Sequence, residues 1–155
     1  MNQWRTLVAS IGLALATSLA GCSSTGSMGS MASMGSSAFD MLGGMSGVSK
    51  LAGGWVDSAM KDPRLSALTA GKSGDTAASK AKVSDQLCAM LGGGCSAPLT
   101  DSQLSSAASK LSPDQSKAVS ETFSSSLNSV ASNPAVRDAV TKALGSKLGG
   151  LGSLL

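Results

Sequence analysis

The sequence predicts an all-α protein, a small bundle of four to six short helices that follows a disordered N-terminal tether rich in Gly, Ser and Met. Three observations lead to this fold class. Apolar residues recur at spacings of three and four in the second half of the chain, three helix-start signals follow one another there, and residues 23–37 contain little besides Gly, Ser and Met. Because the chain has only two Trp, two Phe and no Tyr, the expected core is thin and built mainly from Leu, Val, Ala and Met.

Residues 1–21 have the pattern of a secretory signal peptide. Arg5 lies close to the amino terminus, residues 7–19 are mainly apolar, and small residues precede Cys22, which matches the three regions of such a signal. A transmembrane helix would need roughly 20 apolar residues, more than this run provides. We therefore expect a signal peptide that is removed, rather than a membrane-spanning helix.

The four residues Leu19-Ala20-Gly21-Cys22 resemble the lipobox of bacterial lipoprotein precursors. The resemblance implies that Cys22 receives a diacylglyceryl group on its sulfur, that residues 1–21 are cut off, and that the new amine is acylated. Several acyl chains on one residue anchor a protein firmly, whereas one chain gives only marginal membrane binding. Ser23, in place of Asp, implies sorting to the outer membrane.

Residues 22–37 are predicted to be a lipidated, flexible tether, because their composition cannot bury enough surface to offset chain entropy. Within it Met28, Met31 and Met34 recur at every third position. Clustered thioethers are ligands that select Cu(I), so the three methionines are a candidate copper site. The simpler explanation is that the triplet Gly-Ser-Met is repeated in an unconstrained linker.

The helical domain is expected to span residues 38–155. Over residues 38–60 apolar side chains return at helical spacing, but five glycines interrupt the pattern, and each weakens a helix by up to about 1 kcal/mol relative to alanine. We therefore expect a broken or irregular helix there. Asp62-Pro63 then indicates a turn or a new helix start, followed by a short helical stretch.

The second half of the chain is more regular. Thr100 and Ser112 each begin a capping-box pattern, and Asn133-Pro134 gives a third helix start. Short loops between these starts require the helices to pack closely. The best-defined helices are predicted at about residues 76–91, 101–111, 113–131 and 134–148.

Two cysteines remain after Cys22 is assigned to lipid, namely Cys88 and Cys95. On one continuous helix they would lie about 10 Å apart, too far for a disulfide, but the glycines at 92–94 break the helix between them. We predict a Cys88–Cys95 disulfide, which stabilises the fold by about 2–3 kcal/mol in the chain-entropy description. A metal or redox dithiol is the alternative, although two thiolates without a histidine leave a site incomplete.

Residues 149–155 carry leucines without a helical frame. One interpretation is a tail that folds back over the thin core or frays. The other is an apolar hook that binds a partner or the membrane.

The titratable residues provide no recognisable catalytic site. The chain has no His, the commonest acid–base residue, and no Ser lies in a Gly-x-Ser-x-Gly context. The acidic pairs Asp57 with Asp62 and Asp114 with Glu121 fit surface charge better than a catalytic dyad. The net charge of +3 is too small to indicate nucleic-acid binding.

We therefore expect a lipid-anchored lipoprotein of the outer membrane, facing the periplasm or the cell surface, that acts as a structural or protein-interaction module without catalytic activity or a cofactor. Its expected partners are the membrane, through the lipid on Cys22, and an envelope protein. A Cu(I)-binding lipoprotein that uses Met28, Met31 and Met34 is the alternative function. An enzyme with an unrecognised site is the third.

Overall fold

The computed structural model describes residues 38–70 and 75–155, and within these ranges every regular element is a helix. The predicted all-α class is therefore confirmed. The α-helices described are α2 (Gly44–Lys61), α3 (Ser66–Thr69), α4 (Thr76–Met90), α5 (Asp101–Ala108), α6 (Pro113–Val130), α7 (Pro134–Leu144) and α8 (Leu148–Leu151). Three short 3-10 helices are also described: η1 (Pro63–Leu65) between α2 and α3, η2 (Gly145–Lys147) between α7 and α8, and η3 (Gly152–Leu154) after α8.

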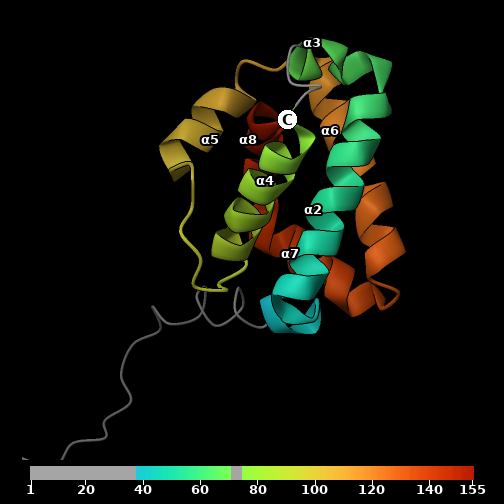
Figure 1. Ribbon diagram of the computed structural model, residues 1–155, viewed down its shortest axis with the longest axis vertical. Coiled ribbons are helices and arrows are strands. Elements are labelled where there is room, and N and C mark those ends of the chain that lie inside the picture. Colours follow the sequence, from blue (N-terminus) through green and yellow to red (C-terminus); the bar gives the residue numbers. More distant parts are fainter. Residues whose placement is uncertain (1–37, 71–74) are drawn as a thin grey trace, which may run out of the picture.

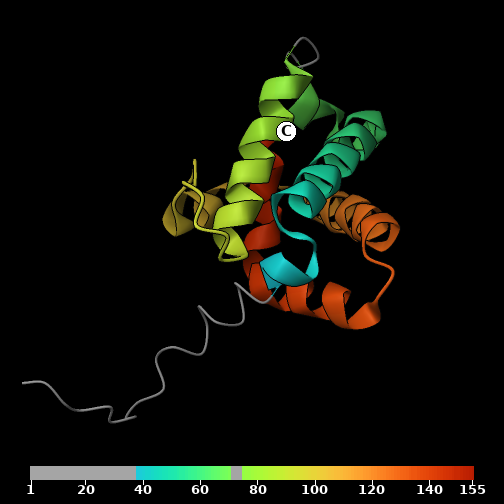
Figure 2. The ribbon, with the colours of Figure 1, turned by 60° about the horizontal axis from the view of Figure 1, so that its bottom comes forward.

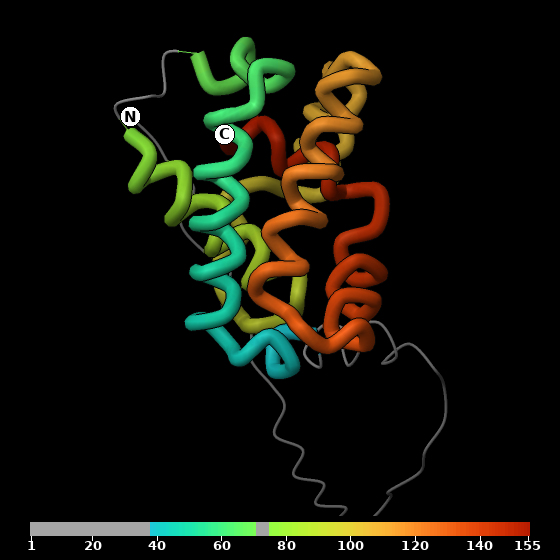
Figure 3. The backbone as a smooth tube through the Cα atoms, turned by 90° about the vertical axis from the view of Figure 1, so that its right-hand side faces the viewer, coloured from blue at the N-terminus to red at the C-terminus, as the bar shows by residue number. Residues whose placement is uncertain are grey.

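The bundle is organised around α2, which packs against α4 on one side and α6 on the other (Figure 1). In the same view α8 lies behind α4, where it contacts both α5 and α6. α7 crosses one end of the bundle, at the bottom of Figure 2. Figure 3 shows α2 and α6 running side by side along most of their length. The elements next to α2 therefore enclose one continuous core.

The two described rings that are most deeply buried meet at the centre of the α2–α6 contact. Trp55 of α2 and Phe123 of α6 have ring centroids 5.7 Å apart and planes at 82°, the edge-to-face arrangement that aromatic pairs favour. The indole nitrogen of Trp55 donates a hydrogen bond to Thr122 Oγ1 at 3.1 Å. Because Trp55 is fully buried, this bond prevents an unsatisfied donor in the core.

The irregular helix expected over residues 38–60 breaks only once. Residues 38–41 form a helical turn, Leu42 and Gly43 form a tight turn, and α2 then continues without interruption to Lys61. The expected break is therefore present, and α2 is continuous beyond it, because burial of one face of α2 outweighs the weak helix propensity of its glycines. A Cβ atom on Gly47 would collide with the carbonyl oxygen of Leu42, so glycine lets this turn pack onto the helix.

The predicted helix starts of the second half are confirmed. Thr100 and Ser112 cap α5 and α6 in capping boxes with Gln103 and Gln115, and the Asn133 side chain accepts a hydrogen bond at the start of α7. α4 and α6 match their predicted ranges to within one residue. α5 ends three residues before the predicted residue 111. Turns follow at residues 109–111, and Ser112, which precedes Pro113, is extended.

The helix predicted over residues 134–148 is two helices, which corrects that prediction. α7 ends at Leu144, and Gly145 has a φ of +49°, in the region that side chains other than glycine rarely adopt. After this turn η2, α8 and η3 carry the chain back across α5. Leu151, Leu154 and Leu155 are buried, so of the two interpretations of the tail, the one in which it folds back over the core is confirmed.

Candidate functional site

The predicted disulfide between Cys88 and Cys95 is present. Their Cα atoms lie 5.7 Å apart, within the usual range for a disulfide. The chain reverses there because α4 ends in a Schellman motif. In this motif the backbone nitrogen of Gly92 donates to the Ala89 carbonyl oxygen at 3.2 Å, and that of Gly93 donates to the Cys88 carbonyl oxygen at 2.8 Å.

Gly93 lies between the disulfide and an aromatic ring. A Cβ atom on Gly93 would stand 2.6 Å from Cys88 Sγ and 2.5 Å from Phe39 Cε2, closer than nonbonded atoms approach. Only glycine fits at this position without a shift of its neighbours. Gly93 therefore lets the Phe39 ring and the disulfide lie close together.

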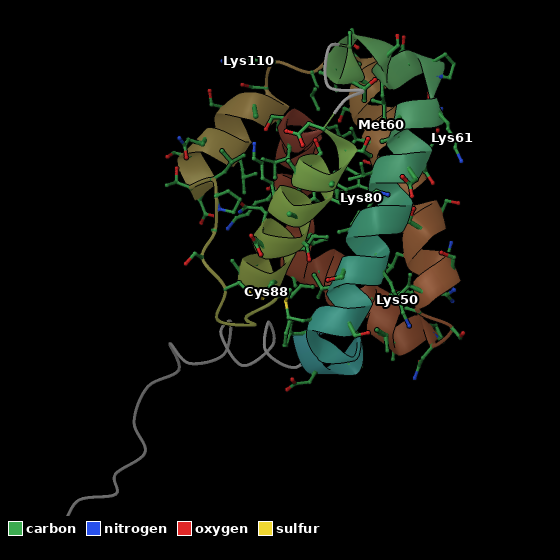
Figure 4. The ribbon with its side chains drawn as sticks, in the orientation of Figure 1. Lys50, Met60, Lys61, Lys80, Cys88 and Lys110 are labelled. Carbon is green, nitrogen blue, oxygen red and sulfur yellow. A yellow bond between two sulfur atoms is a disulfide. The ribbon has the colours of Figure 1, made fainter. Side chains whose placement is uncertain are left out.

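Met45 brings a third sulfur atom to the disulfide. Its Sδ lies 3.6 Å from Cys95 Sγ, and it belongs to the first turn of α2, beside which Cys88 appears in Figure 4. Cys88 is fully buried, whereas 42% of the Met45 side-chain surface is exposed. We call Met45, Cys88 and Cys95 the sulfur cluster.

A second feature is a groove beside α5, with a volume of about 530 Å³. We call it the α5 groove. Its lining comes from three separate parts of the chain, and it includes both apolar residues and polar ones such as Lys110. The lining residues are Leu68, Leu99, Ser102, Gln103, Ser106, Ala107, Lys110, Leu111 and Ser153.

Gln86 holds the loop that forms one side of this groove. Its Oε1 accepts a hydrogen bond from the Leu99 backbone nitrogen at 2.8 Å, and its Nε2 donates to the Leu99 carbonyl oxygen at 3.2 Å. The sequence prediction missed this residue. The available signal was its position three residues after Val83 on the apolar face of α4, because a polar side chain on a buried face needs a specific partner.

Three of the four acidic residues considered as catalytic candidates form ion pairs, and the fourth, Asp114, lies in the first turn of α6. Arg64 Nη2 lies 2.8 Å from Asp62 Oδ2, Arg64 Nη1 lies 2.8 Å from Glu121 Oε2, and Lys80 Nζ lies 2.7 Å from Asp57 Oδ1. Hydrogen bonds from the side chain and backbone of Arg64 hold the pKa of Asp62 below its ordinary value of 3.8. The ion pair between Arg64 and Glu121 joins the segment after α2 to α6.

Four residues predicted to carry function, namely Cys22, Met28, Met31 and Met34, lie outside the described residues. Within the described part, no group of three or more His, Cys, Asp or Glu side chains is arranged to hold a metal ion. None of the helices at residues 38–70 and 75–155 combines the length and apolar character needed to cross a bilayer. No protein-family model, curated protein or solved structure matches this chain.

Proposed function

We propose that this protein is a lipid-anchored envelope lipoprotein whose helical domain acts as a structural or protein-interaction module and has no catalytic activity. Cys22 carries the lipid, residues 22–37 form the tether, and the anchor lies in the outer membrane, facing the periplasm or the cell surface. The lipobox-like sequence at residues 19–22 supports the anchor. The Cys88–Cys95 disulfide supports an oxidising compartment, where such bonds persist.

The α5 groove is the observation that carries the interaction role. In Figure 4 Lys110, one of its lining residues, lies at the end of the bundle opposite Cys88. The first turn of α2, which follows the tether in the chain, lies at the Cys88 end. A domain tethered there would direct the groove away from the membrane and toward a partner with an apolar segment.

Site-specific photocrosslinking in intact envelopes tests this role. A photoreactive residue at position 110 should give a discrete adduct with one envelope protein, and Ala107→Glu should abolish the adduct by placing charge in the groove. The same probe at position 50, an exposed lysine on α2, serves as the matched control. Identical adducts from both positions, or none from position 110, would contradict the proposal.

The second candidate function is Cu(I) binding by Met28, Met31 and Met34. The observation that favours it is the exposure of Met41 and Met45, 43% and 42%, because these thioethers continue the series directly after the tether. An anaerobic Cu(I) competition titration, with and without the three tether methionines changed to leucine, tests it. Equal and weak binding by both proteins would remove this candidate.

A further inference from the structure

We propose that reduction of the Cys88–Cys95 disulfide turns the sulfur cluster into a Cu(I) site whose ligands are the two thiolates and the Met45 thioether. This site uses residues of the folded domain alone, so it depends neither on the lipid anchor nor on the tether methionines. The proposal is based on the 3.6 Å contact between Met45 Sδ and Cys95 Sγ. This contact adds a third soft ligand to the two cysteines, which their spacing in the sequence does not indicate.

The geometry suits one metal ion. Metal–thiolate bonds measure about 2.3 Å, so two sulfur atoms that share a trigonal metal lie about 4 Å apart. The separation between Met45 Sδ and Cys95 Sγ, 3.6 Å, is already close to that value. The two cysteine sulfur atoms start at the bonding distance of a disulfide, about 2 Å, so they must separate by about a further 2 Å to share the metal. Cys95 follows three glycines and is only partly buried, so we assign this movement to Cys95.

The donor set selects a soft ion. Thiolates and thioethers favour Cu(I), whereas carboxylate, carbonyl and water oxygens suit Mg²⁺, Ca²⁺ and Mn²⁺. Within the described residues no cluster of His, Asp or Glu joins the two cysteines. A thioether is a poor ligand for Zn²⁺, whose sites use Cys, His, Asp and Glu. Three sulfur atoms therefore indicate Cu(I).

The chemistry balances with a dithiol as reductant. The dithiol gives two electrons and two protons to the disulfide and becomes a disulfide itself, which leaves Cys88 and Cys95 as thiols. Cu(I) then displaces one proton from each thiol as the Cu–S bonds form. Burial of Cys88 and its position near the end of α4 both disfavour a free thiolate there, and the positive metal ion offsets that penalty.

Access to the cluster is asymmetric. The Phe39 ring and Cys88 Sγ both lie next to Gly93, while Met45, which contacts Cys95, is 42% exposed. A Cu(I) ion would therefore enter past Met45. Removal of this thioether should weaken binding without disturbing the core, because Met45 is not one of the residues of the buried cluster.

The test uses the full chain with Cys22→Ser and with Met28, Met31 and Met34 changed to leucine, so that the sulfur cluster holds the only cysteines and the tether has no thioether. The protein is reduced with a phosphine, the phosphine is removed anaerobically, and Cu(I) is titrated against a chromophoric chelator. The reduced chain should bind one Cu(I). The oxidised chain should bind at least about tenfold more weakly, because it has lost two thiolate ligands.

Met45→Leu in the reduced chain should lower Cu(I) affinity at least about tenfold, on the scale seen when a metal site loses a supporting group. Met41→Leu, the matched exposed methionine, should not change it. X-ray absorption should report three sulfur neighbours in the reference chain and two in Met45→Leu. If reduction alone unfolds the domain, Met45→Leu and Met41→Leu will behave alike. That result, or equal affinity of the oxidised and reduced chains, would overturn the proposal.

Discussion

At the scale of single residues, two glycines of α2 differ in the space around them. Gly47 is buried against the turn before the helix, where a Cβ atom would meet the Leu42 carbonyl oxygen, whereas a Cβ atom on Gly53 would have nothing within 4 Å. Both have ordinary helical backbone angles. Composition alone treats the two positions identically, so the sequence predicted that both would weaken the helix.

Gly53→Ala should therefore stabilise the domain by about 0.5–1 kcal/mol, because alanine favours the helix and restricts the unfolded chain. Gly47→Ala should destabilise it, since Leu42 must move to admit the methyl group. Urea unfolding followed by circular dichroism measures both changes. Stabilisation by both substitutions would show that the turn at Leu42 does not pack as described.

The Asp62–Arg64 contact makes the free energy of unfolding depend on pH, and the direction of that dependence follows from the pKa of Asp62. The pKa of Asp62 is lowered in the folded protein from its ordinary 3.8, chiefly by the Arg64 side-chain hydrogen bond. A carboxyl with a depressed folded-state pKa stabilises the fold above its unfolded pKa. That contribution is lost as the pH falls through the folded value.

Asp62→Asn should accordingly be less stable than the parent at neutral pH, and the difference should shrink as the pH falls below about 4. Asparagine still accepts the backbone hydrogen bond, so the difference reports mainly the charge. Thermal unfolding across this pH range is the measurement, with Arg64→Gln as the background that removes the partner. A difference that is constant with pH would contradict the assignment.

At the scale of elements, the helices with strong local signals were predictable and the breaks between them were less so. Each capping box, at Thr100 and at Ser112, involves only four consecutive residues. The sequence alone therefore predicts where α5 and α6 start. The break at Gly145 was missed because Leu144 and Leu148 keep helical spacing across it. The positive φ of Gly145 turns the chain back onto α5, and no local sequence pattern indicates this reversal.

The candidate site was predictable only in part. The spacing of Cys88 and Cys95 around three glycines was enough for the disulfide, because it depends on local chain reversal. Met45 and Gln86 were missed, since the first meets Cys95 fifty residues away and the second meets Leu99 across a loop. Contacts of this kind follow from tertiary packing and leave no local pattern.

Gln86→Leu should release the loop that lines the α5 groove. The substitution leaves the Leu99 backbone nitrogen without its acceptor at 2.8 Å, and loss of such buried pairing costs about 1–3 kcal/mol. Hydrogen exchange at the Leu99 amide should become faster. Asp85→Asn, on the exposed neighbour, should leave that exchange unchanged. Protection at Leu99 that survives Gln86→Leu would mean that another group holds the loop.

At the scale of the whole molecule, the described residues form one thin core around α2, closed on one side by the returning tail. Trp55 and Phe123 supply the rings at its centre, and leucines from nearly every helix complete it. The exposed Met41 and Met45 and the Cys88–Cys95 disulfide lie toward the end of the bundle at which the described part of the chain begins. Lys110, which lines the α5 groove, lies at the other end (Figure 4). The proposed anchor at Cys22 would therefore hold the domain at the end opposite the groove.

The proposed localisation and partners of this protein both depend on the lipid anchor at Cys22. Intact-mass spectrometry of the protein purified from membranes tests this anchor most directly. A chain that begins at Cys22, carries acyl groups there and is two hydrogens lighter than its dithiol form is the predicted result. A chain recovered from the cytosol with Met1 in place, no acyl group and three free thiols would contradict it.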